Sequence, residues 1–217
     1  MVNYPDDSIE KNFLSCGRTV CGIDEVGRGA WAGPLVLAAV VPGEGTIEGV
    51  RDSKKISAKK RKFLSLQIWN WAKAIGIGEV SNSEIDEIGL ARSLTLGANR
   101  AIEQVRRSHG NIDVVLLDGP FDFIGDKKSE VVTVVKGDDT SHLIACASIV
   151  AKVYRDNLMC SSEIAGRYHD FVFESNKGYP SKIHKQALKK YGPTELHRIS
   201  WNILEQPFSQ TSLEVLV

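Results

Sequence analysis

The stretch from residue 19 to residue 41 reads TVCGIDEVGRGAWAGPLVLAAVV, and it decides the fold class. Two apolar runs, residues 19–24 and 34–41, have the composition of β-strands, and a glycine-rich segment lies between them. Because glycine allows a tight turn, the two runs predict a β-hairpin. Asp24 and Glu25 stand where the first run meets the turn.

Beyond the hairpin, helical and strand patterns alternate along the chain. Ser57 and Ser141 are suited to begin helices as N-caps. The expected helices are 57–72, 88–109, 141–159 and a short basic one between Pro180 and Pro193; the expected strands are 75–80, 112–117 and 131–135. Three early strands followed by helix, strand, strand and helices predict an α/β domain with a mixed sheet.

Length and composition indicate the class of protein. A chain of 217 residues with 42% hydrophobic residues predicts a single domain over 1–217, with a core at about 18–204 and a short C-terminal tail. No apolar run approaches the roughly 20 residues that span a bilayer, and the acidic start does not resemble a secretion signal. The cysteines show no metal-binding spacing, which predicts reduced thiols. We expect a cytoplasmic monomer without membrane contact.

Carboxylates follow three of the expected strands. In chain order these acids are Asp24, Glu25, Asp118, Asp138 and Asp139. If the strands are neighbours, the acids lie close together, and such a cluster is stable only when partly protonated or bridged by cations. Oxygen ligands suit Mg²⁺ or Mn²⁺, and two such ions about 4 Å apart can hydrolyse a phosphodiester. The alternative is that each acid only caps a turn, since Asp and Gly are common turn residues.

Local charge narrows the choice of substrate. The whole chain is neutral, with 27 basic and 27 acidic residues. Residues 51–62, however, contain seven Lys or Arg and one acid, and residues 177–198 contain six and one. A single cluster could serve solubility alone, but two favour a polyanion such as nucleic acid. Two alternatives stay open: a metal phosphatase for small esters, and a catalytically silent nucleic-acid-binding module of the same fold.

Several blocks of the sequence resemble the motifs of the type 2 ribonuclease H (ribonuclease HII) family. The blocks are GIDEVGRG with AGP at 22–34, DSKK at 52–55, LDG at 117–119, KGD at 136–138, ASIVAKV at 147–153, KGYP at 177–180 and HRISW at 197–201. They follow the family order over roughly residues 20–201, with Trp201 where Phe is usual. The resemblance implies an α/β ribonuclease H-like fold, a central five-stranded mixed sheet flanked by helices.

The resemblance also implies a set of functional residues. The implied catalytic acids, which would bind two Mg²⁺ or Mn²⁺ ions and the scissile phosphate, are Asp24, Glu25, Asp118 and Asp138. The implied sensor of the ribonucleotide, through its 2′-OH, consists of Gly27, Arg28, Gly29 and Tyr179. Expected phosphate contacts are Lys54, Lys152, Arg155, Lys177 and His184. Lys152 and Arg155 could equally be helix-surface charges paired with Asp156.

The activity implied by the resemblance is that of an endoribonuclease in DNA replication and repair. It would hydrolyse the RNA strand of RNA/DNA hybrids and cut 5′ to ribonucleotides embedded in duplex DNA, leaving 3′-hydroxyl and 5′-phosphate ends. Arg28 between the two glycines favours this family over the sister ribonucleases HIII. The tail after Trp201 has no clamp-binding aromatic pair, so we expect no sliding-clamp contact.

Overall fold

The computed structural model describes residues 4–201 and 203, and it is built on one five-stranded sheet in the order β3-β2-β1-β4-β5. The strands are β1 (Val20–Val26), β2 (Leu35–Val41), β3 (Ala74–Val80), β4 (Val114–Asp118) and β5 (Glu130–Val134). β1 pairs antiparallel with β2, and β2 with β3, whereas β1 with β4 and β4 with β5 are parallel. The predicted hairpin and five-stranded mixed sheet are confirmed.

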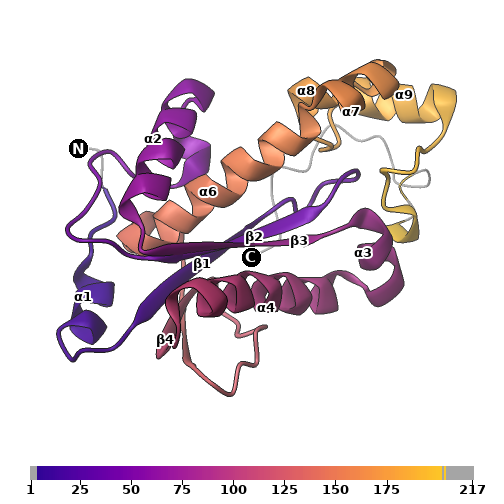
Figure 1. Cartoon of the computed structure of the whole chain (residues 1–217). Coiled ribbons are helices and arrows are strands. Elements are labelled where there is room, and N and C mark those ends of the chain that lie inside the picture. The colour runs from indigo at the N-terminus through magenta and orange to yellow at the C-terminus, as the bar shows by residue number, and fades with distance from the viewer. Residues whose placement is uncertain (1–3, 202, 204–217) are drawn as a thin grey trace.

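Helices cover both faces of the sheet (Figure 1). The helices α2 (Ala58–Trp71) and α6 (His142–Met159) lie on one face, and α4 (Leu90–His109) lies on the other. The strands supply apolar side chains to both layers because alternate residues point to opposite faces. On β1, Val20 packs in the cluster under α6, whereas Cys21 and Ile23 pack against α4.

The remaining helices are short, and those at the C-terminal end pack together beyond the end of α6 (Figure 1). They are α1 (Ser8–Leu14), α3 (Asn82–Ile88), α5 (Gly137–Thr140), α7 (Ser162–Arg167), α8 (Phe173–Asn176), α9 (Lys182–Tyr191) and the 3-10 helices at Ser53–Lys55, His169–Phe171 and Ile199–Trp201. The C-terminal group surrounds a third apolar cluster that includes Trp31, Met159 and Phe173. The predicted helix between Pro180 and Pro193 is confirmed as α9.

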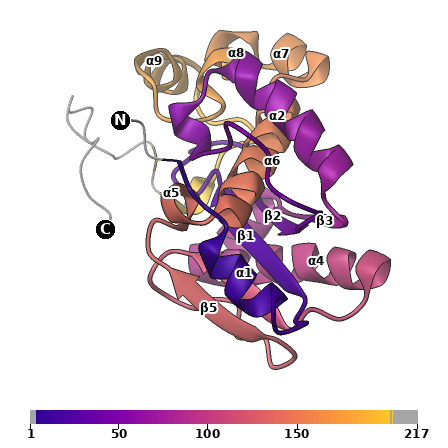
Figure 2. The same cartoon turned by 90° about the vertical axis from the view of Figure 1, so that its left-hand side faces the viewer.

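Two differences from the expected elements affect the packing around the site. β1 continues through Val26, so Asp24 lies inside the strand instead of at its end. The unpredicted helix α1 lies beside β1 and the start of α6 (Figure 2), where its Glu10 is 2% exposed. The Glu10 carboxylate accepts hydrogen bonds from the Leu143 N–H and the Ser141 hydroxyl, and so caps the start of α6.

Other expectations concern cysteines, the membrane and the tail. The four cysteines are free, as predicted. No helix in the described part of the chain is long and apolar enough to cross a membrane. The predicted tail at 206–217, on which the expectation of no sliding-clamp contact rested, lies outside the described residues.

Candidate active site

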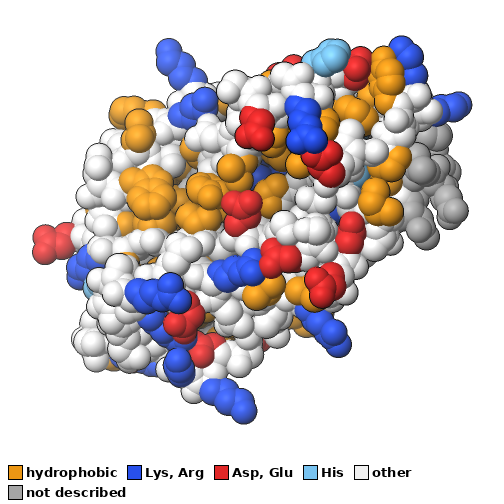
Figure 3. Space-filling model, turned by 45° about the vertical axis from the view of Figure 1, so that its right-hand side comes forward, with side chains coloured by type: hydrophobic (Ala, Val, Ile, Leu, Met, Phe, Trp, Pro, Cys, Tyr) orange, Lys and Arg blue, Asp and Glu red, His pale blue; other side chains and the backbone are white. Residues whose placement is uncertain are grey.

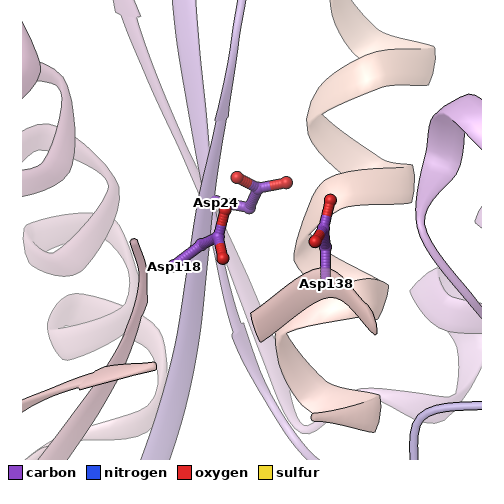
Figure 4. A group of neighbouring side chains, drawn as sticks. All are labelled: Asp24, Asp118 and Asp138. Atoms are coloured by element: carbon purple, nitrogen blue, oxygen red, sulfur yellow. The ribbon is translucent and has the colours of Figure 1, made fainter. Parts of the chain in front are cut away.

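Three aspartates from three elements form a compact cluster (Figure 4). Ile23 on β1 lies opposite Leu117 on β4, so the next residues, Asp24 and Asp118, are neighbours on parallel strands. Both point to the α6 face, because each is an even number of residues from a side chain packed under α6. Asp138, on α5, completes the cluster, and ligand oxygens of all three acids lie within 4.8 Å of one another.

Close backbone packing holds the third acid against the sheet. A Cβ atom at Gly22 would lie 2.9 Å from the backbone carbon of Leu143, so only glycine lets the start of α6 lie this close to β1. The Gly137 N–H donates a 2.6 Å hydrogen bond to Asp118 Oδ1. These contacts fix α5, and with it Asp138, beside the two strand acids.

The structure does not bring Glu25 into this three-aspartate cluster. Glu25 follows Asp24 directly on β1 and is near enough to raise the pKa of Asp24, but it is not among the acids whose ligand oxygens lie within 4.8 Å of one another. Its Oε1 lies 3.7 Å from Arg28 Nη1. The assignment of Glu25 as a metal ligand therefore stays a prediction.

Burial and like charge make the cluster a strong site for cations. Burial raises the pKa of Asp24 well above its usual range, and the nearby Glu25 and Asp118 carboxylates raise this pKa further. Burial, with Asp118 next in importance, raises the pKa of Asp138 to about 6. One cation of the protein lies near, with Lys54 Nζ 3.8 Å from Asp138 Oδ2. A divalent ion would relieve this repulsion, and the all-oxygen ligand set suits Mg²⁺ or Mn²⁺.

The turn Gly27–Gly29 lies next to Tyr179 in the structure. Gly27 and Tyr179 are 152 positions apart in the sequence, and the Gly27 N–H donates a 3.1 Å hydrogen bond to Tyr179 Oη. Gly27 has a φ of 90°, and a Cβ there would lie 2.4 Å from Arg155 Nε and 2.8 Å from the Pro34 carbonyl oxygen. A Cβ at the exposed Gly29 would meet nothing within 4 Å. The first glycine is therefore required by the fold, whereas the second is free for a ligand to approach.

Two expected phosphate contacts are wrong, because both side chains are fully buried. Arg155 is neither a phosphate contact nor a surface charge paired with Asp156: it is 0% exposed, and its guanidinium donates to backbone carbonyls. His184 is also 0% exposed. Its ring nitrogens contact the Tyr179 carbonyl oxygen and His197.

The three expected lysines differ in how available they are. Lys54 is exposed at the cluster. Lys152 Nζ bonds to Asp156 Oδ1 at 2.7 Å, as the alternative reading expected, and lies 5.6 Å from the centre of the Tyr179 ring. Lys177 Nζ contacts the backbone carbonyl of Glu174. Lys54 is therefore the best placed of them for a phosphate near the aspartates.

Two buried residues beside the turn Gly27–Gly29 and Tyr179 were not singled out by the sequence. His197 and Arg198 are 1% and 0% exposed; His197 contacts His184, and Arg198 donates to the Arg28 carbonyl oxygen in the turn. Both residues belong to the HRISW block at 197–201, but no periodicity or spacing in the sequence indicates which groups they contact.

Comparisons with known proteins agree with the fold. The family model for Ribonuclease HII matches residues 21–204. The ribonuclease HII of Streptomyces avermitilis is 39% identical over 204 residues, covering 93% of this chain and 85% of that protein. The ribonuclease HII of Caldicellulosiruptor bescii is 43% identical over 201 residues, covering 90% of this chain and 94% of that protein.

Similarity extends to solved structures. The structure of the PCNA:RNase HII complex from Archaeoglobus fulgidus superposes with a TM-score of 0.68 at 25% identity, and the match covers 87% of this chain and 98% of that chain. The sequence similarity spans nearly the whole chain, and the sheet carries a buried aspartate cluster. The chain therefore belongs to the ribonuclease HII family of metal-dependent endoribonucleases.

Proposed function

We propose that the protein hydrolyses the RNA strand of RNA/DNA hybrids and cuts duplex DNA on the 5′ side of an embedded ribonucleotide, leaving 3′-hydroxyl and 5′-phosphate ends. One observation carries the proposal: Asp24, a member of the aspartate cluster, lies on the strand β1 that leads into the turn hydrogen-bonded to Tyr179. A site for a cleavable phosphate and a site for a ribose are thus only a few residues apart.

The metal site would be formed by Asp24, Asp118 and Asp138, with Glu25 as a further ligand. Two Mg²⁺ or Mn²⁺ ions held there would supply the means to activate a water molecule and to stabilise the leaving oxygen. The protein holds the three aspartates in position through the β1–β4 pairing and the Gly137 N–H. Asp24 and Asp138 are buried and Asp118 is partly buried, which strengthens their attraction for cations.

Recognition of the ribose would fall to the turn and to Tyr179. The Tyr179 oxygen already accepts the Gly27 N–H, so its own O–H is free to donate to a 2′-OH. The exposed Gly29 leaves room for a close backbone approach. Because the 2′-OH is both donor and acceptor, such groups can distinguish RNA from DNA.

Contacts with the phosphate backbone would come from local basic residues, since the chain as a whole is neutral. On the face in Figure 3, Lys and Arg side chains are mixed with Asp and Glu side chains. This face therefore has no continuous positive surface for a long polyanion. Lys54 beside the aspartates, and the exposed lysines of 51–62, offer a more favourable surface. Binding should therefore weaken as salt is raised.

Cleavage of an end-labelled DNA duplex with one ribonucleotide tests the proposal directly. With Mg²⁺ or Mn²⁺ we expect one cut, 5′ to the ribonucleotide, no cut in the matching all-DNA duplex, and several cuts in an RNA/DNA hybrid. Cleavage of the hybrid alone would show a different junction specificity. Salt-sensitive binding without any cut would favour the silent module, and hydrolysis of small phosphate esters alone would favour the phosphatase.

Metal should stabilise the folded protein more at high pH than at low pH. The raised pKa of Asp138, about 6, means that the folded state keeps a proton that the unfolded state, near 4, has already lost. Stability of the metal-free protein therefore falls as pH rises through about 6, and a bound cation reverses that loss. We expect the rise in melting temperature on adding Mg²⁺ or Mn²⁺ to be larger at pH 8 than at pH 5, measured by calorimetry.

The variant Asp138→Asn provides the control for this effect, because it removes the titrating group. The difference between pH 5 and pH 8 should shrink in the variant. An equal rise at both pH values in the unmodified protein would contradict the assignment of the aspartates as the metal site.

A further inference from the structure

Three segments distant in sequence meet behind the turn Gly27–Gly29. The Trp31 and Ala32 N–H groups both donate to the Gly178 carbonyl oxygen, at 2.9 and 3.2 Å. The Gly33 N–H donates to the Leu196 carbonyl oxygen at 2.8 Å. Residues 31–33, the segment before Tyr179, and residues 196–198 thus form one hydrogen-bonded unit, and His197 and Arg198 lie inside it.

Arg198 binds the turn segment through its buried guanidinium. Its Nη1 donates to the Arg28 carbonyl oxygen at 3.1 Å, and its Nε and Nη2 both donate to the Gly33 carbonyl oxygen. Among the residues that the structure describes, no carboxylate forms an ion pair with Arg198, and its Cζ lies over the Trp201 ring, 4.8 Å from the ring centre. Burial, with the nearby Arg155, lowers the pKa of Arg198 to about 9, so it is charged at neutral pH.

The bond to Arg28 decides which way one peptide group faces. In a planar trans peptide the C=O of one residue and the N–H of the next point in opposite directions. The Arg28 carbonyl is turned inward to Arg198, so the Gly29 N–H must point outward. The Gly27 carbonyl is likewise occupied, by the Ala30 N–H at 3.2 Å, which closes the turn. The exposed edge of the turn therefore presents the Gly29 donor.

His197 acts on the other half of the sensor, through His184. The Thr194 N–H donates to His197 Nδ1 at 2.9 Å, so the proton of neutral His197 is on Nε2. That Nε2 lies 2.9 Å from His184 Nε2, which leaves the His184 proton on Nδ1, 2.8 Å from the Tyr179 carbonyl oxygen. Burial lowers the pKa of both rings, that of His197 to about 4, so both are neutral at pH 7.

We propose that the dipeptide His197-Arg198 positions the ribonucleotide sensor: Arg198 turns the Gly29 N–H outward, and His197, through His184, fixes Tyr179 beside it. Both donors, the Gly29 N–H and the Tyr179 hydroxyl, then reach one 2′-OH together. This inference rests on the proposed function, because it names what holds that site in place. His197 and Arg198 themselves do not touch the substrate.

The test compares two affinities of the full chain, for a duplex with one ribonucleotide and for the same duplex in DNA alone. Binding is measured with Ca²⁺ under conditions where no product forms. The variant Arg198→Lys keeps the charge but loses the fork that reaches Arg28 and Gly33 together. We expect its preference for the ribonucleotide to fall about fivefold, the equivalent of one hydrogen bond of about 1 kcal/mol, with affinity for the all-DNA duplex unchanged.

A second pair of variants tests the histidine half by rescue. His184→Leu removes the donor to the Tyr179 carbonyl and should lower the preference, whereas His184→Asn keeps an N–H near the position of Nδ1 and should restore much of it. The matched control is Arg106→Lys on α4, a largely buried arginine paired with Asp126 on the opposite face of the sheet. It should lower the melting temperature but leave the preference intact.

The outcomes separate failure of the proposed function from failure of the positioning role. If the unmodified protein shows no preference for the ribonucleotide, the proposed function fails. If it shows the preference, and folded Arg198→Lys and His184→Leu retain it, the positioning role is overturned. Should these variants not fold, the unmodified protein still answers by NMR: the Gly29 amide resonance should shift more with the ribonucleotide duplex than with all-DNA duplex, and equal shifts would refute the outward donor.

Discussion

Replacing Asp24 with asparagine is expected to abolish cleavage and, at the same time, to stabilise the metal-free protein. Mutating a residue that only hydrogen-bonds to a metal ligand typically lowers activity about 10- to 100-fold. Loss of a central ligand should therefore lower activity by more than about 100-fold. Asp24 is 6% exposed, and burial and three neighbouring acids raise its pKa, which means that its ionised form destabilises the folded state at neutral pH. Asparagine removes that charge. Its amide oxygen can still accept the Glu25 N–H, which now bonds to Asp24 Oδ1 at 2.7 Å.

Two measurements separate these effects. Single-turnover cleavage gives the loss of activity, and thermal unfolding without divalent metal gives the change in stability, with about 2–4 °C expected for each kcal/mol. Asp139→Asn is the matched control, since Asp139 pairs with Lys55 and is not in the cluster. It should retain most of the activity. A destabilised Asp24→Asn with normal cleavage would contradict the metal site.

The two glycines of the turn should respond in opposite ways to alanine. Gly27→Ala should lower the free energy of unfolding by about 3 kcal/mol, because it adds a Cβ to a left-handed residue and forces that atom onto the Pro34 carbonyl oxygen. Gly29→Ala should leave stability within about 0.5 kcal/mol, since it meets no atom within 4 Å. The added methyl group would nevertheless stand where the substrate backbone approaches, and we expect loss of the preference for ribonucleotides.

Chemical denaturation of both variants, beside cleavage of ribonucleotide and hybrid substrates, checks this prediction. Each variant serves as the control for the other, because the same chemical change is made two residues apart. A stable Gly27→Ala, or a Gly29→Ala that still selects the ribonucleotide, would show that the turn does not have the role assigned to it.

Much of the fold could be predicted because its elements are encoded locally. The apolar runs around the glycine-rich turn predicted the β1–β2 hairpin, and serine caps predicted the starts of α2 and α6. Short elements were missed where local signals are weak. The seven-residue helix α1, for example, is held by the contact of Glu10 with α6, which no nearby residue indicates.

The candidate site was predicted in part, and the division has a physical cause. The sequence by itself determined that carboxylates suited to a metal follow the apolar runs, Asp24, Asp118 and Asp138 among them, and the resemblance to ribonucleases HII implied the turn Gly27–Gly29 and Tyr179 as the ribose site. Only the tertiary structure decided which groups meet and which are buried. The packing of β4 and α5 against β1 brought three aspartates together and left Glu25 outside their cluster, and long-range packing buried Arg155 and His184, contrary to expectation. Side chains that reach across the fold are placed by contacts between segments far apart in the sequence. A pattern along the chain does not indicate which of those segments meet.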